Sequence, residues 1–235
     1  MPAIGYALLA AAANVAGAFA VAWPERRSLR VLDALIAIAA GFMVSVALTE
    51  LIPEALAQDG RRAALVMLGG YVLVHLTQHT LAQHFHFGVE THLVTASVSL
   101  SALGGLLLHT FVDGVAIASG FAVSDTVGIL VFLAIVLHKL PEGLAIASLF
   151  LAAGWGRRAA IAAGGALGLA TVVGVMLTHV AEPLARNGLA LSAGVTLYVG
   201  ASNLVPEFQS RRGWRLAAYF FGSCALYLSA RMLLR

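Results

Sequence analysis

Long runs of apolar residues alternate with short polar connections along the whole chain. A helix needs about 20 apolar residues to cross a bilayer. Several of the connections, such as 24–27, 58–61, 154–157 and 210–213, are only a few residues long, so we expect function to reside between helices rather than outside them. The pattern predicts an all-α integral membrane protein with eight transmembrane helices in a single domain, 1–235. Their ranges are 3–23, 30–53, 62–82, 92–121, 126–153, 158–180, 188–208 and 214–233.

Composition supports a membrane protein. Hydrophobic residues make up 60% of the chain and charged residues only 11%, with a mean hydropathy of +0.92, whereas soluble domains carry about 25% charged residues. The first apolar run has no basic segment before it, which favours a retained helix over a cleaved signal peptide. No basic stripe accompanies the pI of about 9.4, so we expect no nucleic-acid partner. Cys224, the single cysteine, excludes a disulfide framework and a cysteine-based metal cluster.

The arginines between the runs predict an orientation. If the N-terminus faces outward, the inner side carries eight arginines and the outer side five, and basic residues favour the cytoplasmic side. We therefore expect both termini outside. The inner arginines are 26, 27, 30, 157, 158, 211, 212 and 215, and the outer ones are 61, 62, 186, 231 and 235.

The second and seventh runs resemble each other at a constant offset of 153 residues. Ala40-Gly41 leads to Glu50-Leu-Ile-Pro-Glu54, and Ala193-Gly194 leads to Asn203-Leu-Val-Pro-Glu207. The two runs cross the membrane in opposite directions, which is typical of the inverted repeats that many secondary transporters use. Helices one to three then pair with six to eight around central helices four and five. Repeated packing units without a transport role are the alternative interpretation.

The fourth and fifth runs hold a duplicated motif, His-x-x-x-acid-Gly-x-Ala-Ile-Ala-Ser. One copy begins at His109 and contains Asp113, and the other begins 29 residues later at His138 and contains Glu142. Ionisable side chains are costly inside a membrane and indicate a functional site. Residues four apart share a helix face, so each histidine projects with its own acid.

A short connection makes the two motif helices antiparallel neighbours, and this brings the four side chains together. Two imidazoles and two carboxylates suit Zn²⁺, and mixed nitrogen and oxygen ligands also admit Fe²⁺, Mn²⁺ or Cd²⁺. Hydrogen bonds that only join two helices are the alternative. Gly114 and Gly143 would let the two backbones approach closely.

Lys139 follows His138 directly and lies about 100° around the helix. Two carboxylates and one ammonium sum to −1, and a divalent ion changes this to +1. A lysine there would compete with a second cation. Pairing with a carboxylate, or snorkelling, is the other interpretation.

These motifs resemble those of the ZIP family, the zinc–iron permease-like transporters, and the Leu-Ile-Pro-Glu and Leu-Val-Pro-Glu segments do so too. The resemblance implies eight helices in a 3+2+3 arrangement, both termini outside, uptake of a divalent metal toward the cytosol by alternating access, and homodimers. The metal is the substrate, and no organic cofactor is expected. We expect a multi-pass protein of a bacterial inner (plasma) membrane, with lipid around it.

By motif position, His109, Asp113, His138 and Glu142 match the family's primary metal site. Some members bind a second metal through an Asn after the first histidine and an acid after the second; Thr110 and Lys139 stand there in this chain. The sixth run has no interior carboxylate either. We therefore expect a mononuclear site with the Lys139 ammonium in the place of the second metal.

Other polar residues are candidates for the pathway. Glu50 and Glu54 would mark its outer end, and Asn203 and Glu207 its inner end, although carboxylates at helix ends are commonly just solvated. The family often has a His-rich cytosolic segment between helices three and four. Its counterpart here is a candidate cytosolic metal site, with solvated histidines as the equal alternative: His75, His79, His84, His86 and His92.

Two functions compete with inward transport. An intramembrane metal-dependent hydrolase would use the same ligands to activate water, but it needs a spare general base, and no Ser nucleophile motif or His-Glu-x-x-His appears. An efflux carrier would use the same ligands in the opposite direction. The sequence favours a carrier, not an enzyme, and leaves the direction to the family resemblance.

Overall fold

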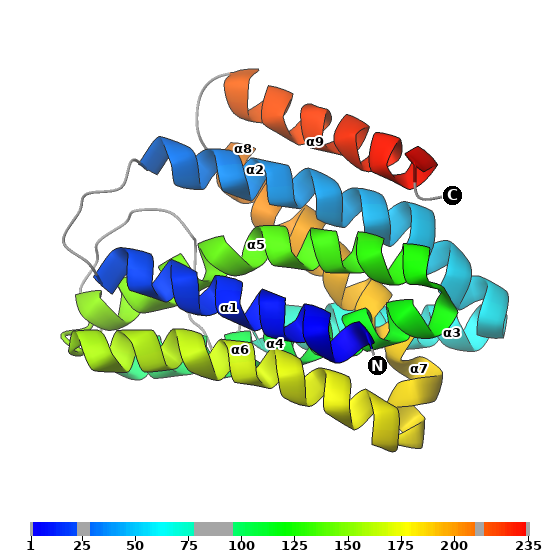
Figure 1. Cartoon of the computed structure of the whole chain (residues 1–235), viewed down its shortest axis with the longest axis horizontal. Coiled ribbons are helices and arrows are strands. Elements are labelled where there is room, and N and C mark those ends of the chain that lie inside the picture. Colours follow the sequence, from blue (N-terminus) through cyan, green and yellow to red (C-terminus); the bar gives the residue numbers. More distant parts are fainter. Residues whose placement is uncertain (1, 23–28, 78–95, 210–213, 234–235) are drawn as a thin grey trace.

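The computed structural model describes residues 2–22, 29–77, 96–209 and 214–233. Within these ranges the chain is helical almost throughout (Figure 1). The elements are α1 (Pro2–Ala22), α2 (Leu29–Val46), η1 (Ala47–Leu51), α3 (Ile52–Leu76), α4 (Ala96–Val123), α5 (Asp125–Ala152), α6 (Arg157–Val180), α7 (Glu182–Leu197), η3 (Tyr198–Leu204), α8 (Val205–Gln209) and α9 (Trp214–Leu233).

By length and composition, six helical stretches among the described residues could cross a membrane. One of them, Asp33–Leu76, runs for 44 residues through α2, η1 and α3. It bends at Asp59 and Gly60, whose backbone angles are not helical; Gly60 has a φ of 33°. Glycine tolerates that positive φ because it has no β-carbon. The predicted connection at 58–61 is therefore a sharp bend.

The long helices lie roughly side by side, and the start of α1 and the end of α9 are at the same end of the bundle (Figure 1). Helices α1, α4, α5 and α6 pack together, with α1 against α5 and α6 and with α4 against α5 and α6. Helix α3 packs against α7, and α9 packs against α2. Only Ser124 separates α4 from α5, and its hydroxyl caps α5 by accepting a hydrogen bond from the Val127 amide at 3.2 Å.

The helix contacts repeat in a regular way. Helix α1 packs on α5 as α6 packs on α4. Likewise, α2 packs on α5 as α7 packs on α4, and α2 packs on α9 as α7 packs on α3. In each pair, the second contact follows from the first when predicted helices one to three are exchanged with six to eight, and four with five. Three contacts in one half of the chain therefore have a counterpart in the other half.

Two π-helical segments occupy matching places. Segment η1 precedes Pro53 and η3 precedes Pro206, at the offset of 153 residues. Proline has no N–H to bond the carbonyl four residues before it, and such a lost bond favours a local change of helical pitch. The Leu-x-Pro-Glu echo thus has a backbone counterpart in both halves.

The motif glycines are contact points, but not between α4 and α5. A β-carbon on Gly114 would overlap the backbone carbonyl of Thr171 in α6, and one on Gly143 would overlap that of Asn14 in α1. The prediction that these glycines bring α4 and α5 together was wrong about the partner. Instead, they let α6 and α1 approach the backbones of the two motif helices.

Candidate metal-binding site

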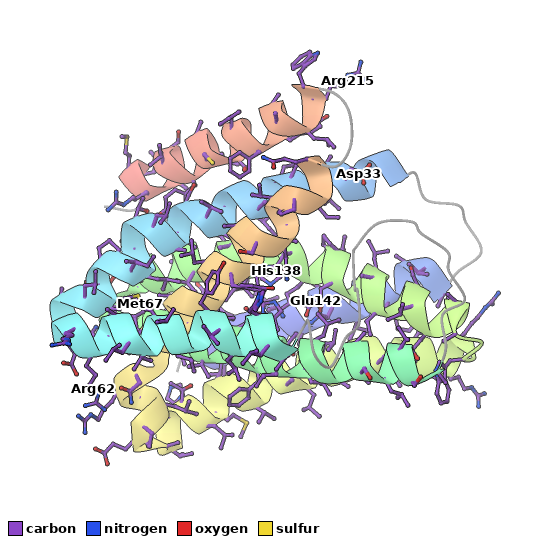
Figure 2. The ribbon with its side chains drawn as sticks, turned by 180° about the vertical axis from the view of Figure 1, so that it is seen from behind. Asp33, Arg62, Met67, His138, Glu142 and Arg215 are labelled. Atoms are coloured by element: carbon purple, nitrogen blue, oxygen red, sulfur yellow. The ribbon has the colours of Figure 1, made fainter. Side chains whose placement is uncertain are left out.

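The four predicted ligands lie together in the interior. His109 and Asp113 come from α4, His138 and Glu142 come from α5, and none is more than 4% exposed. One ligand atom from each lies within 4.8 Å of the others. Figure 2 shows His138 and Glu142 deep among the helices, whereas Arg62 and Arg215 lie at the periphery. The spacing and the antiparallel packing of α4 and α5 produce this cluster.

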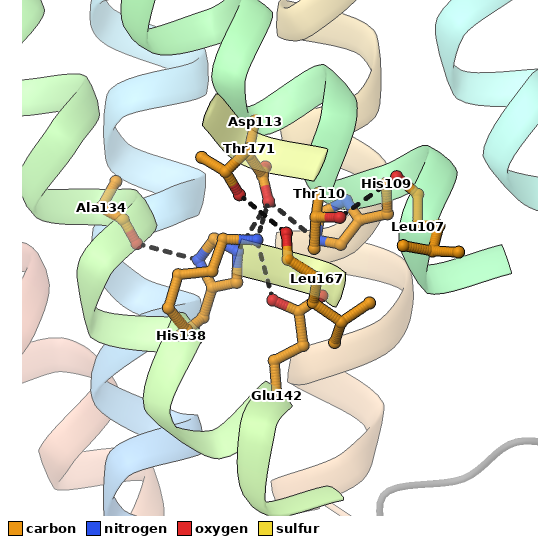
Figure 3. A network of polar contacts seen from close by, with 10 residues as sticks. Leu107, His109, Thr110, Asp113, Ala134, His138, Glu142, Leu167 and Thr171 are labelled. Carbon is orange, nitrogen blue, oxygen red and sulfur yellow. Dashed lines mark hydrogen bonds and ion pairs between the residues drawn. The ribbon is translucent and has the colours of Figure 1, made fainter. Parts of the chain in front are cut away.

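Asp113 is at the centre of the cluster (Figure 3). Its Oδ2 atom lies 3.3 Å from Nε2 of His109 and 3.3 Å from Nε2 of His138. The first contact joins residues four apart on α4, and the second crosses to α5. The two rings lie 5.5 Å apart between centroids.

The orientation of His138 suits a metal ligand. Its Nδ1 lies 3.1 Å from the carbonyl oxygen of Ala134. A carbonyl only accepts, so Nδ1 donates and carries the ring proton. In the neutral imidazole this leaves the lone pair on Nε2, which faces the cluster, and ligating histidines are commonly held in this way.

Lys139 occupies the interior with the acids. The side chain is fully buried, and its Nζ donates to Asp113 Oδ2 at 2.6 Å and to Glu142 Oε2 at 2.8 Å. It is the only lysine in the chain. The alternative interpretation, that Lys139 pairs with a carboxylate, is therefore confirmed, and the lysine pairs with both acids of the site. Two negative charges and one positive charge leave the cluster at −1 with neutral histidines.

Several polar atoms of the site have no hydrogen-bond partner among the described residues. They include Nδ1 of His109 and Oε1 of Glu142. Both belong to groups that ligate metals, and a buried polar atom without a partner calls for an explanation such as an ion or a water molecule. The donor set therefore fits a divalent cation as a substrate.

Thr110, which stands at the second-metal position of α4, is buried and donates to the carbonyl of Leu107 at 3.1 Å. Its hydroxyl is thus engaged within its own helix turn (Figure 3). In α6, whose described interior has no carboxylate, Thr171 bonds the carbonyl of Leu167 at 3.4 Å.

Glu50 and Glu54 are not part of the four-residue cluster. Glu50, in η1, forms an ion pair with Arg231 of α9 and accepts from the Tyr227 hydroxyl at 3.3 Å. Glu54 accepts from Gln58 at 3.3 Å. Asn203 lies in η3 and Glu207 in α8.

Of the candidate histidines, His75 is exposed near the end of α3, and its Nδ1 lies 3.3 Å from the Tyr198 hydroxyl. The others, His79, His84, His86 and His92, lie outside the described residues. The proposed cytosolic histidine site is therefore untested.

Sequence reasoning missed Asn14. This residue of α1 is fully buried, and neither amide atom has a partner among the described residues. Its backbone touches Gly143, the neighbour of Glu142. An amide in the otherwise apolar run 3–23 was the available signal, because polar groups inside a membrane are expensive.

The fold and the site define a multi-pass helical membrane protein with a buried metal-binding cluster. The family model of the ZIP zinc transporters matches residues 78–229, which is more than half of the chain. The protein therefore belongs to the ZIP zinc transporter family, whose members are carriers and not enzymes. The hydrolase interpretation is not retained. A search among curated proteins finds no match to the chain.

Proposed function

We propose that the protein carries Zn²⁺ across the membrane toward the cytosol by alternating access. The observation that supports this most directly is the convergence of two imidazoles and two carboxylates within 4.8 Å in the bundle interior. Fe²⁺, Mn²⁺ and Cd²⁺ are further substrates that this donor set would accept. His109, Asp113, His138 and Glu142 hold the ion in this proposal.

The proposal includes a single metal per site. Lys139 fills the space between the two carboxylates that a second ion would need, and a second divalent charge would be repelled by its ammonium. The same lysine offsets part of the negative charge of the site before the metal arrives. It also weakens metal binding, which suits a carrier that must release its substrate.

The architecture proposed is a single transporter domain, 1–235, of eight membrane helices in a 3+2+3 arrangement. The corresponding contacts of α1 with α5 and of α6 with α4, and the two π segments, support inverted repeats around α4 and α5. Both termini face outward in this proposal, in a bacterial plasma membrane, and the protein forms homodimers.

Metal uptake into proteoliposomes tests the function. Wild-type protein is expected to give metal-dependent flux, and Asp113→Asn and Glu142→Gln are expected to abolish it while keeping the fold. Asp125→Asn is a matched control, because that carboxylate is exposed at the start of α5. Absence of flux with the wild type, or unchanged flux in both site variants, would contradict the proposal.

Vesicles with known protein orientation decide the direction. Inward transport predicts that a metal gradient applied from the side of the termini loads the vesicle, in line with the arginine distribution. Efflux remains the second candidate, because the ligands themselves do not define a direction. Metal movement only away from the cytosolic side, with no uptake from the side of the termini, would establish efflux.

A further inference from the structure

Two buried hydroxyl groups outside the metal cluster have no hydrogen-bond partner among the described residues. They belong to Ser119 of α4, which is 5% exposed, and Ser192 of α7, which is fully buried. A hydroxyl buried without a partner costs free energy, because water would otherwise solvate it. Serine hydroxyls inside helices usually bond the carbonyl of the preceding turn, as Ser148 does with Leu144 at 2.8 Å.

Both hydroxyls lie at the packing of α4 on α7. A β-carbon on Gly188 of α7 would be 2.5 Å from the Ser119 hydroxyl and 2.8 Å from Val115 of α4. The Ser119 hydroxyl therefore points at α7. Ser192 follows Gly188 by four residues and lies on the same helix face.

This packing lies between the metal cluster and one end of the bundle. Ser119 is six residues beyond Asp113, about 9 Å along α4, toward the α4–α5 turn. Helix α7 starts at that end and runs back toward the cluster, so Ser192 and then the buried Thr196 lie progressively deeper. We call Ser119, Gly188, Ser192 and Thr196 the hydroxyl seam. The same end carries the start of α1 and the end of α9 (Figure 1).

The equivalent packing of α2 on α5 is apolar. At the offset of 153 residues, Ser192 and Thr196 correspond to Ala39 and Met43, both fully buried. Gly188 corresponds to Leu35. Ser148, the counterpart of Ser119, is exposed. The polar groups thus occur in one of two corresponding interfaces, and helix packing alone does not require such a difference.

We propose that the hydroxyl seam is the route by which a partly hydrated divalent cation reaches the four-ligand cluster from the end that carries the termini. Hydroxyl oxygens replace some of the water around the ion, and they do so weakly enough to let it move on. At the corresponding positions of α2, Ala39 and Met43 offer no side-chain oxygen atom to an ion. The inference rests on the proposed transport function.

Isosteric substitutions test the route. Valine and threonine have the same shape, but only threonine has a hydroxyl. We expect Ser119→Val and Ser192→Val to lower the initial rate of Zn²⁺ uptake by about tenfold, whereas Ser119→Thr and Ser192→Thr stay within about threefold of wild type. Equilibrium Zn²⁺ binding to the purified variants should be unchanged, because the four ligands are intact.

Val and Thr variants that transport at the same rate would overturn the route. Because both substitutions add a methyl group to a tight packing, cysteine labelling provides an independent measurement. In a Cys224→Ser background, Ser192→Cys should react with a membrane-impermeant methanethiosulfonate during turnover, and Ala39→Cys should react at least about tenfold more slowly. Equal rates at both positions would overturn the proposal.

Failure of the transport function itself has a different result. In that case the wild type takes up no Zn²⁺, so rates cannot be compared at all. Failure of the seam alone leaves wild-type uptake intact and makes valine and threonine equivalent.

Discussion

The Nζ atom of Lys139 lies 2.6 Å from Oδ2 of Asp113, and neither side chain is more than 1% exposed. The contact joins α5 to α4 at the centre of the candidate metal site. A buried ion pair is costly to break, because the remaining charge is left without a partner. The lysine is therefore part of the site's electrostatics and not an incidental neighbour.

Removal of the ammonium is expected to make the protein depend on metal for stability. In Lys139→Met, the carboxylates of Asp113 and Glu142 lose their common counter-charge, and unfolding free energy without metal falls by about 3–5 kcal/mol. Zn²⁺ should then raise the melting temperature more than in wild type. Arg62→Met is the control: Arg62 is 49% exposed in its pair with Asp59, and exposed pairs contribute about 0–1 kcal/mol. Equal melting behaviour of the two variants would contradict the role of Lys139.

Replacement of the lysine by an acid should change the number of metals bound. We expect one Zn²⁺ per chain in wild type and two in Lys139→Asp, since a third carboxylate would then face the space between Asp113 and Glu142. Metal analysis of the purified protein after equilibrium dialysis measures this ratio. Two ions per chain in the wild type would disprove the mononuclear site.

The close contact at Gly114 predicts a strong effect of a single methyl group. Gly114→Ala places a β-carbon on the Thr171 carbonyl and should destabilise the protein by about 1–3 kcal/mol or more. Gly104→Ala, on the same helix, has no atom within 4 Å of the new β-carbon and should be neutral or stabilising, by up to about 1 kcal/mol. Thermal unfolding in detergent compares them; the same loss in both would argue against the contact.

The buried amide of Asn14 predicts a gain in stability on its removal. Asn14→Val deletes two polar atoms that have no partner among the described residues. Removal of such an unsatisfied buried group should raise the free energy of unfolding by about 1–3 kcal/mol. Asn187→Val, at an amide that donates to the Pro183 carbonyl at 2.8 Å near the protein surface, should change stability little. A loss of stability in Asn14→Val would indicate that the amide is bonded in the membrane.

The ion pair of Glu50 with Arg231 separates a structural role from a pathway role. Either Glu50→Ala or Arg231→Ala should lower the melting temperature, since each leaves a partly buried charge unpaired. The exchanged pair, Glu50→Arg with Arg231→Glu, should recover most of the loss. If the exchanged protein is folded but does not transport, Glu50 contributes to the pathway itself.

Much of the site was predictable because its signals are local. The His-x-x-x-acid spacing fixes which side chains share a helix face, and the short connection between the fourth and fifth apolar runs favours antiparallel packing of the two helices. Both facts follow from helical periodicity and chain connectivity. The convergence of His109, Asp113, His138 and Glu142 was predicted in this way, and the observed contacts confirm that they lie together.

The sequence by itself determined the apolar helices, the duplicated motif and the echo of Pro53 in Pro206, because each is a pattern of residue types along the chain and needs no knowledge of which helices are neighbours. Only the tertiary structure decided which helices and side chains these residues contact. Gly143 packs on α1 and not on α4, and Lys139 contacts two acids rather than one. Contacts of this kind depend on which helices become neighbours and how they are rotated about their axes, and hydrophobic periodicity carries little of that information when helices are apolar on all sides.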